Sequence, residues 1–85
     1  MANRKDLKKN LNNMVYDIVE ECFTIQMFDE SKTKEADVII DAAANYQDQM
    51  LTKINAAKTK ADFRPLTLDI ENTAVDFINK LNALN

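Results

Sequence analysis

Residues 7–25 read LKKNLNNMVYDIVEECFTI, and apolar residues recur in this stretch every three or four positions. This spacing places them on one face of an α-helix, because the helix completes a turn about every 3.6 residues. Asn3 is a suitable N-cap, and Asp6 follows at the spacing of a capping box. We therefore expect a first helix over residues 3–28, with an apolar stripe of Leu7, Leu11, Met14, Val15, Ile18, Cys22 and Ile25.

A second amphipathic segment predicts a helix over residues 33–60. Residues 29–33 form a polar break, and either Ser31 or Thr33 can cap the helix that follows. Residues 38–40 alone would suit a strand, but the alanines and the helical spacing after them favour a helix. The expected apolar face comprises Ala36, Ile39, Ile40, Ala43, Tyr46, Met50, Leu51, Ile54 and Ala57.

The third amphipathic segment predicts a helix over residues 67–84, after a connection at residues 61–66. Pro65 disfavours the α conformation of the residue before it, so the second helix should stop before Arg64. Thr67 is a suitable N-cap for the third helix. The expected apolar face comprises Ile70, Ala74, Phe77, Ile78, Leu81 and Leu84.

Three helices with short connections predict an all-α fold, in the form of an up-down-up antiparallel three-helix bundle. The chain has 85 residues, which predicts a single helical domain over residues 1–85. It contains neither Gly nor His. Without Gly no phosphate-cradling loop can form, and without His the commonest general base and metal ligand is missing. We therefore expect no catalytic residues, no cofactor, no metal site and no enzymatic activity.

Composition also predicts where the protein resides. No stretch has the roughly 18 consecutive apolar residues that a transmembrane helix needs. The chain opens with Arg4, Lys5 and Asp6, and the apolar segment of a secretory signal does not follow them. The single Cys22 cannot form an intrachain disulfide, which fits a reducing compartment. These features predict a cytoplasmic protein without a membrane anchor, and the many Asn, Lys and Ile residues indicate a bacterial source.

Several segments resemble a family of small uncharacterised all-helical proteins of Bacteroidetes-type bacteria. The resemblance lies in the basic opening at residues 4–10, in a long first helix that ends in aromatic residues, in Ala36 and Asp37 at the opening of the second helix and in the closing residues 76–82. The resemblance implies the helical fold and carries no activity with it.

The first helix carries a second apolar stripe beside the main one, so its apolar arc is wider than one neighbouring helix requires. Either the third helix covers this stripe, or a partner does, most simply a second copy across a twofold axis. Two more apolar residues near the following turn favour the partner. We therefore expect a homodimer that acts as a structural or protein-interaction module, alongside a possible unidentified protein partner. The candidate interface comprises Tyr16, Val19, Phe23, Met27, Phe28 and Val38.

Charge is unevenly distributed along the chain, whose formal net charge is −3. Basic residues gather at the start of the first helix and near the end of the second, which meet at one end of an antiparallel bundle. Anion or nucleic-acid binding at this basic pole is the alternative function. The acidic net charge and the scarcity of aromatic residues disfavour nucleic acid as a partner. The pole comprises Arg4, Lys5, Lys8, Lys9, Lys58, Lys60 and Arg64.

Four single residues carry further expectations. Cys22 should be a buried small hydrophobe, and Tyr46 should pack its ring while its hydroxyl stays in water. Gln47 falls on the apolar face of the second helix, where it either fixes the register through a buried hydrogen bond or lies at the boundary of the core. Arg64 either meets Asp69 or contacts a partner at the surface. The acids of the first two helices should face solvent.

Overall fold

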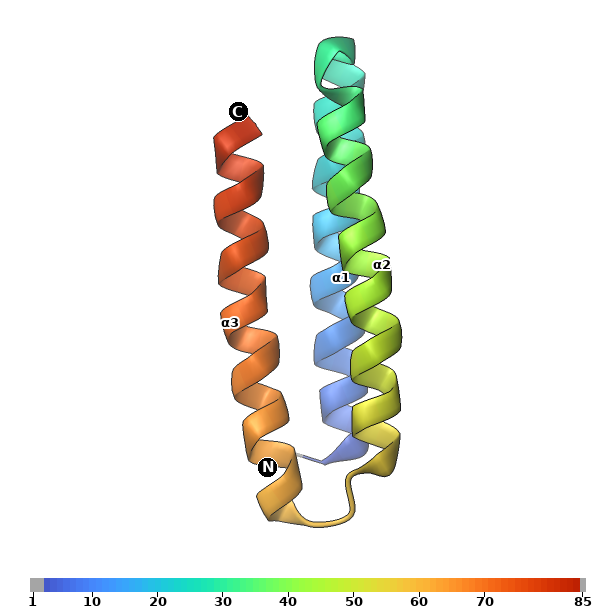
Figure 1. Ribbon diagram of the computed structural model, residues 1–85, viewed down its shortest axis with the longest axis vertical. Helices are drawn as coiled ribbons and strands as arrows, with labels where there is room; N and C mark the ends of the chain where they lie inside the picture. Colours follow the sequence, from blue (N-terminus) through green and yellow to red (C-terminus); the bar gives the residue numbers. More distant parts are fainter. Residues whose placement is uncertain (1–2, 85) are drawn as a thin grey trace.

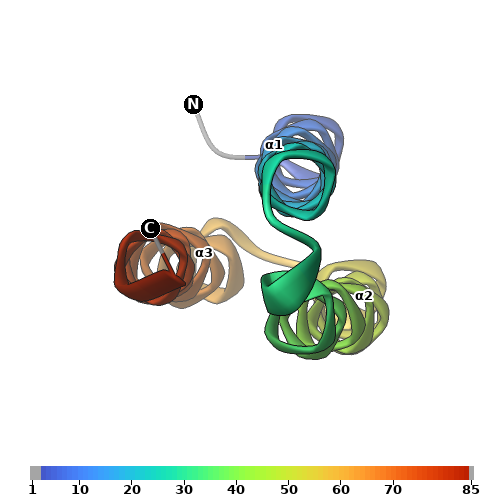
Figure 2. The same ribbon diagram turned by 90° about the horizontal axis from the view of Figure 1, so that it is seen from above.

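The computed structural model describes residues 3–84, and helices account for nearly all of them (Figure 1). Within these residues there is no strand, so the all-α prediction is confirmed. In Figure 1 the chain rises along α1, returns along α2 and rises again along α3. Seen from above in Figure 2, the three helices lie at the corners of a triangle. The elements are α1 (Arg4–Phe28), the short 3₁₀ turn η1 (Glu30–Lys32), α2 (Thr33–Ala56) and α3 (Lys60–Leu84).

One hydrophobic core runs between the helices, and all three contribute to it. The main stripe expected on the first helix is buried, apart from Met14, which is half-buried at the edge of the core. Two alanines of α2, Ala36 and Ala43, are fully buried. The buried residues of the cluster are Leu7, Leu11, Val15, Ile18, Cys22, Ile25, Ala36, Ile39, Ala43, Met50, Ile54, Ile70, Phe77 and Leu81.

The start of α1 is fixed by two side chains. Asn3 Oδ1 accepts a hydrogen bond of 2.9 Å from the backbone N–H of Asp6, which confirms Asn3 as the N-cap. The guanidinium of Arg4 donates two hydrogen bonds, of 3.1 and 2.7 Å, to the carbonyl oxygen of Ala57. Arg4 therefore ties the beginning of α1 to the residue that ends α2, where backbone carbonyls have no helical partner.

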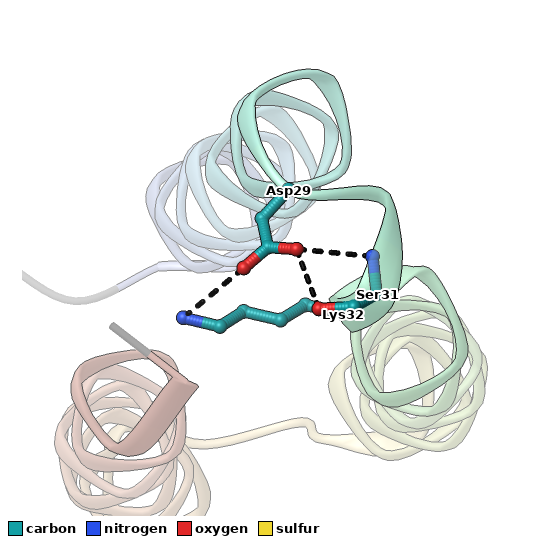
Figure 3. Close-up of polar contacts among 3 residues, drawn as sticks. All are labelled: Asp29, Ser31 and Lys32. Carbon is teal, nitrogen blue, oxygen red and sulfur yellow. Dashed lines mark hydrogen bonds and ion pairs between the residues drawn. The ribbon is translucent and has the colours of Figure 1, made fainter.

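The turn between α1 and α2 is capped by Asp29, not by Ser31 or Thr33 as the sequence suggested (Figure 3). Asp29 Oδ1 accepts hydrogen bonds from the backbone N–H of Ser31 at 3.0 Å and from its hydroxyl at 2.5 Å. These bonds lower the pKa of the Asp29 carboxyl, and Lys32 adds an ion pair at 3.9 Å. The expectation failed because the 3₁₀ turn η1 precedes α2, so the capping side chain lies before that turn, at Asp29, closer to the N-terminus than either expected residue.

The connection between α2 and α3 also differs from the prediction. α2 ends at Ala56 instead of residue 60, and α3 begins at Lys60 instead of residue 67. A reciprocal capping box sets this start. The hydroxyl of Thr59 accepts from the backbone N–H of Asp62 at 3.3 Å, and Asp62 Oδ2 accepts from the N–H groups of Thr59 and Lys58 at 3.1 and 3.0 Å. The two backbone bonds lower the pKa of Asp62.

Pro65 consequently lies inside α3, in its second turn. A proline there lacks the N–H that would bond to the carbonyl of Ala61, which costs the helix one hydrogen bond. Phe63 and Leu66, on either side of the proline, pack against the core as helical residues. Thr67 is not an N-cap, since its hydroxyl donates to the carbonyl of Phe63 at 3.0 Å. Capping and apolar packing together outweigh the local effect of the proline.

Thr59→Ala should lower the free energy of unfolding by about 1 kcal/mol, because it removes the hydroxyl that caps α3. Thr52→Ala is the matched control, since Thr52 is exposed within α2, four residues before the helix ends, where alanine is the better helix former. Urea unfolding followed by circular dichroism gives both values. Equal stabilities of the two variants would mean that the Thr59 hydroxyl does not cap α3.

Candidate functional site

Among the described residues, no three Asp, Glu or Cys side chains come together in a way that could hold a metal ion. Cys22 is buried, and burial raises the pKa of its thiol, with a smaller contribution from the charges of Glu21 and Asp37. A buried thiol with a raised pKa is a poor nucleophile. None of the helices that the structure describes has the length and apolar content to cross a membrane.

The first candidate surface is a stripe on the outside of α1. Tyr16, Phe23 and Met27 are 68%, 54% and 81% exposed, so α3 does not cover them. They are separated by seven and four residues, which places them along one side of the helix. Val19, from the same predicted stripe, is half-buried and packs against the core. We call Tyr16, Phe23 and Met27 the outer stripe.

The two other residues of the candidate interface lie elsewhere. Phe28 is exposed at the end of α1, seven residues after Glu21 and fourteen after Met14, on the side of the helix that turns toward α3. Val38 is exposed on α2 and lies two positions after the buried Ala36, on the other side of the helix, so it points away from the core. The predicted interface is therefore not one continuous surface, and only the outer stripe gathers on one side.

The seven residues of the basic pole do share one end of the molecule, where α1 and α3 begin and α2 ends (Figure 1). Arg4 is engaged with Ala57, and Lys8 is half-buried. The other five are exposed. Helix N-termini attract anions through free backbone N–H groups, and one such group in each helix is already bonded, that of Asp6 to Asn3 and that of Asp62 to the Thr59 hydroxyl. The pole thus offers exposed cations beside two helix N-termini that are partly capped.

The second surface is a groove between α1 and α3, which sequence reasoning missed. A hollow of about 360 Å³ is lined by Met14, Asp17, Ile18, Glu21, Ala74, Ile78 and Leu81. A smaller one of about 170 Å³ continues it toward the start of both helices and is lined by Leu7, Asn10, Met14, Thr67, Ile70, Glu71 and Ala74. The two hollows share Met14 and Ala74 and together form what we call the α1–α3 groove.

The α3 wall of this groove carries one exposed apolar side chain, Ile78, which was expected in the core and is 51% exposed. Leu68 and Val75 on the same helix are exposed as well, outside the lining of the groove. Val75 and Ile78 are one turn apart, and Leu68 lies two turns before Val75. This spacing was a signal in the sequence, because it extends the apolar arc of α3 beyond the face that the core needs.

A polar cluster joins α2 to α3 on the side away from the groove. The hydroxyl of Tyr46 donates to Asp69 Oδ1 at 2.6 Å, so the expectation of a hydroxyl in water was wrong. Thr73 also donates to Asp69, at 3.2 Å, and the Tyr46 ring packs edge-on against Phe77 with a centroid distance of 6.4 Å. Burial and the Asp69 carboxylate raise the pKa of Tyr46 to about 12. Asp69 is thus engaged by Tyr46 and Thr73 and not by Arg64.

A similar polar contact joins α1 to α2. Gln47 Nε2 donates to Asn12 Oδ1 at 2.8 Å in a bond exposed to solvent, so Gln47 lies at the boundary of the core and does not fix the register through a buried hydrogen bond. Near the α1–α2 turn, Gln26 donates to Asp37 at 2.7 Å. Both bonds join α1 to α2 at the surface, and we assign them a structural role.

Comparison of the chain with protein-family models, with curated proteins and with solved structures found no match. The resemblance to a Bacteroidetes-type family therefore stays a prediction. What the protein does must be argued from its two apolar surfaces and its charge.

The free energy of unfolding should fall as the pH rises from about 10 to about 12. Tyr46 loses its proton near pH 12 when folded, whereas a tyrosine in the unfolded chain does so near pH 10, so its stabilising effect is complete below pH 10 and lost above 12. Tyr46→Phe should reduce this fall and cost about 1 kcal/mol near pH 8.

Tyr16→Phe, on the exposed outer stripe, is the control and should keep the pH dependence of the wild type. Urea unfolding of the three proteins across this pH range provides the measurement. A Tyr46→Phe protein with the same pH dependence as the wild type would show that the bond to Asp69 does not act in this way.

Proposed function

We propose that this chain is a non-enzymatic helical interaction module, an up-down-up three-helix bundle that associates with a second copy of itself. The observation that carries the proposal is the outer stripe of α1. Single exposed apolar residues are ordinary on protein surfaces, but two aromatic rings and a methionine along one side of a helix form a patch. Such patches mark sites where proteins associate.

A twofold dimer is the simplest way to cover this stripe, because a twofold axis brings the same patch of both copies together. Association would also stabilise a chain of only 85 residues, whose single core leaves little margin of stability. The net charge of −3 per copy opposes association, which favours a weak dimer over a permanent one. We place this module in the cytoplasm, because a lone buried thiol suits a reducing compartment.

The alternative proposal is anion binding at the basic pole. Lys5, Lys9, Lys58, Lys60 and Arg64 are exposed there and would attract phosphate groups. Because the net charge of −3 opposes anion binding, and one amide at each helix N-terminus is already bonded to a side chain of the protein, we rank this function below self-association. Binding of this kind would weaken steeply as salt is added, whereas association through the outer stripe would not.

Phe23→Glu should raise the dissociation constant of the homodimer at least about tenfold, because it places a charge in an apolar interface. Met27→Glu should act in the same direction, and its greater exposure makes it the safer change for the fold. Val38→Glu, at an exposed site outside the outer stripe, should leave association unchanged.

Sedimentation equilibrium up to several hundred micromolar measures the three constants, and circular dichroism verifies that each variant is folded. A wild-type protein that stays monomeric over this range would rule out the dimer. Equal weakening by Val38→Glu and Met27→Glu would place the interface elsewhere.

A further inference from the structure

The α1–α3 groove has a floor that suits an apolar ligand. Met14 and Ile18 of α1 line it together with Ala74 and Leu81 of α3. On the α3 side Ile78 also lines it and remains half-exposed. An unfilled apolar groove on a helical bundle leaves surface that another helix can bury, since helices pack by fitting side-chain ridges into grooves.

The length of the groove defines the size of its occupant. Its lining runs from Leu7 to Glu21 on α1 and from Thr67 to Leu81 on α3. A helix rises about 1.5 Å per residue, so fourteen steps along either helix span about 21 Å. This is the length of about four helical turns, and a docked helix of about 14 residues would fill it.

The charges beside the groove identify the chemistry of the occupant. The charged residues that line it are Asp17 and Glu21 on α1 and Glu71 on α3, all of them acidic. Acids therefore stand on both sides of the apolar floor. If a second copy presented the same groove, it would bring these carboxylates toward one another, and like charges in an interface are costly. A basic occupant, by contrast, would meet a complementary charge on each side.

We propose that the α1–α3 groove docks an amphipathic helix of a partner protein, about 14 residues long, with an apolar ridge flanked on both sides by Lys or Arg. The ridge rests on Met14 and Leu81, and the long flanking side chains extend along the walls to Asp17 and Glu21 on one side and to Glu71 on the other. The docked segment becomes a fourth helix of the bundle. This surface is distinct from the outer stripe, so the chain can bind a partner while it pairs with a second copy.

Two synthetic peptides of about 18 residues test the proposal. Both carry leucine at the core positions of a helical heptad, and one has Lys and the other Glu at the flanking positions. Titration of each into the ¹⁵N-labelled protein should show that the Lys peptide binds at least about tenfold more tightly. The amide signals of residues 14–21 and 74–81 should shift, while those around Met27 should not.

Paired charge variants separate docking in the groove from general attraction to an acidic protein. Glu21→Lys reverses a charge that lines the groove, and Glu20→Lys makes the same change of net charge on the adjacent exposed residue outside it. Glu21→Lys should weaken binding of the Lys peptide about fivefold more than Glu20→Lys does. Ile78→Glu should also weaken it, because it places a carboxylate on the apolar wall.

Three results would overturn the proposal. These are equal binding of the Lys and Glu peptides, equal effects of Glu21→Lys and Glu20→Lys, and peptide-induced shifts confined to the outer stripe. If instead Ile78→Glu abolished self-association of the chain without peptide, the groove would be occupied by a second copy and not by a basic helix. The effect of Met27→Glu on the dissociation constant of the homodimer tests the outer stripe separately. Failure of peptide docking in the groove would therefore not decide whether the proposed homodimer forms.

Discussion

The buried stripe of α1 packs against both other helices, and the arrangement of the whole bundle depends on it. The core that it forms includes the fully buried alanines Ala36 and Ala43 of α2, whose small side chains allow helices to approach closely. It also includes larger side chains of α3 such as Phe77 and Leu81, and two hollows lie between α1 and α3. The same stripe of α1 thus borders both the core and the α1–α3 groove.

Polar contacts then determine how the helices align. Arg4 joins the start of α1 to the end of α2, and Tyr46 joins α2 to α3 through Asp69. With their ends and middles fixed in this way, the helices hold their remaining apolar residues outward. The outer stripe and the groove are therefore the apolar surfaces that the core leaves uncovered.

Periodicity alone predicted most of the fold, including the cap at Asn3 and the buried face of α1. It failed between α2 and α3 because Pro65 was taken to end a helix, although Thr59 and Asp62 stand at capping-box spacing and start α3 before it. The outer stripe was visible in the sequence as apolar residues beyond what one neighbour needs. The groove could not be predicted from the sequence. Its shape depends on how α1 and α3 lie side by side, and the apolar pattern of a single helix gives no information about that arrangement.

The central claim is that the outer stripe and the groove face different partners. Amide spectra of the ¹⁵N-labelled protein alone, recorded from about ten micromolar to about one millimolar, test it most directly. The account predicts concentration-dependent shifts at Tyr16, Phe23 and Met27, with the signals of Ile18 and Ile78 unchanged. Spectra that do not change with concentration, or changes centred on Ile18 and Ile78, would contradict it.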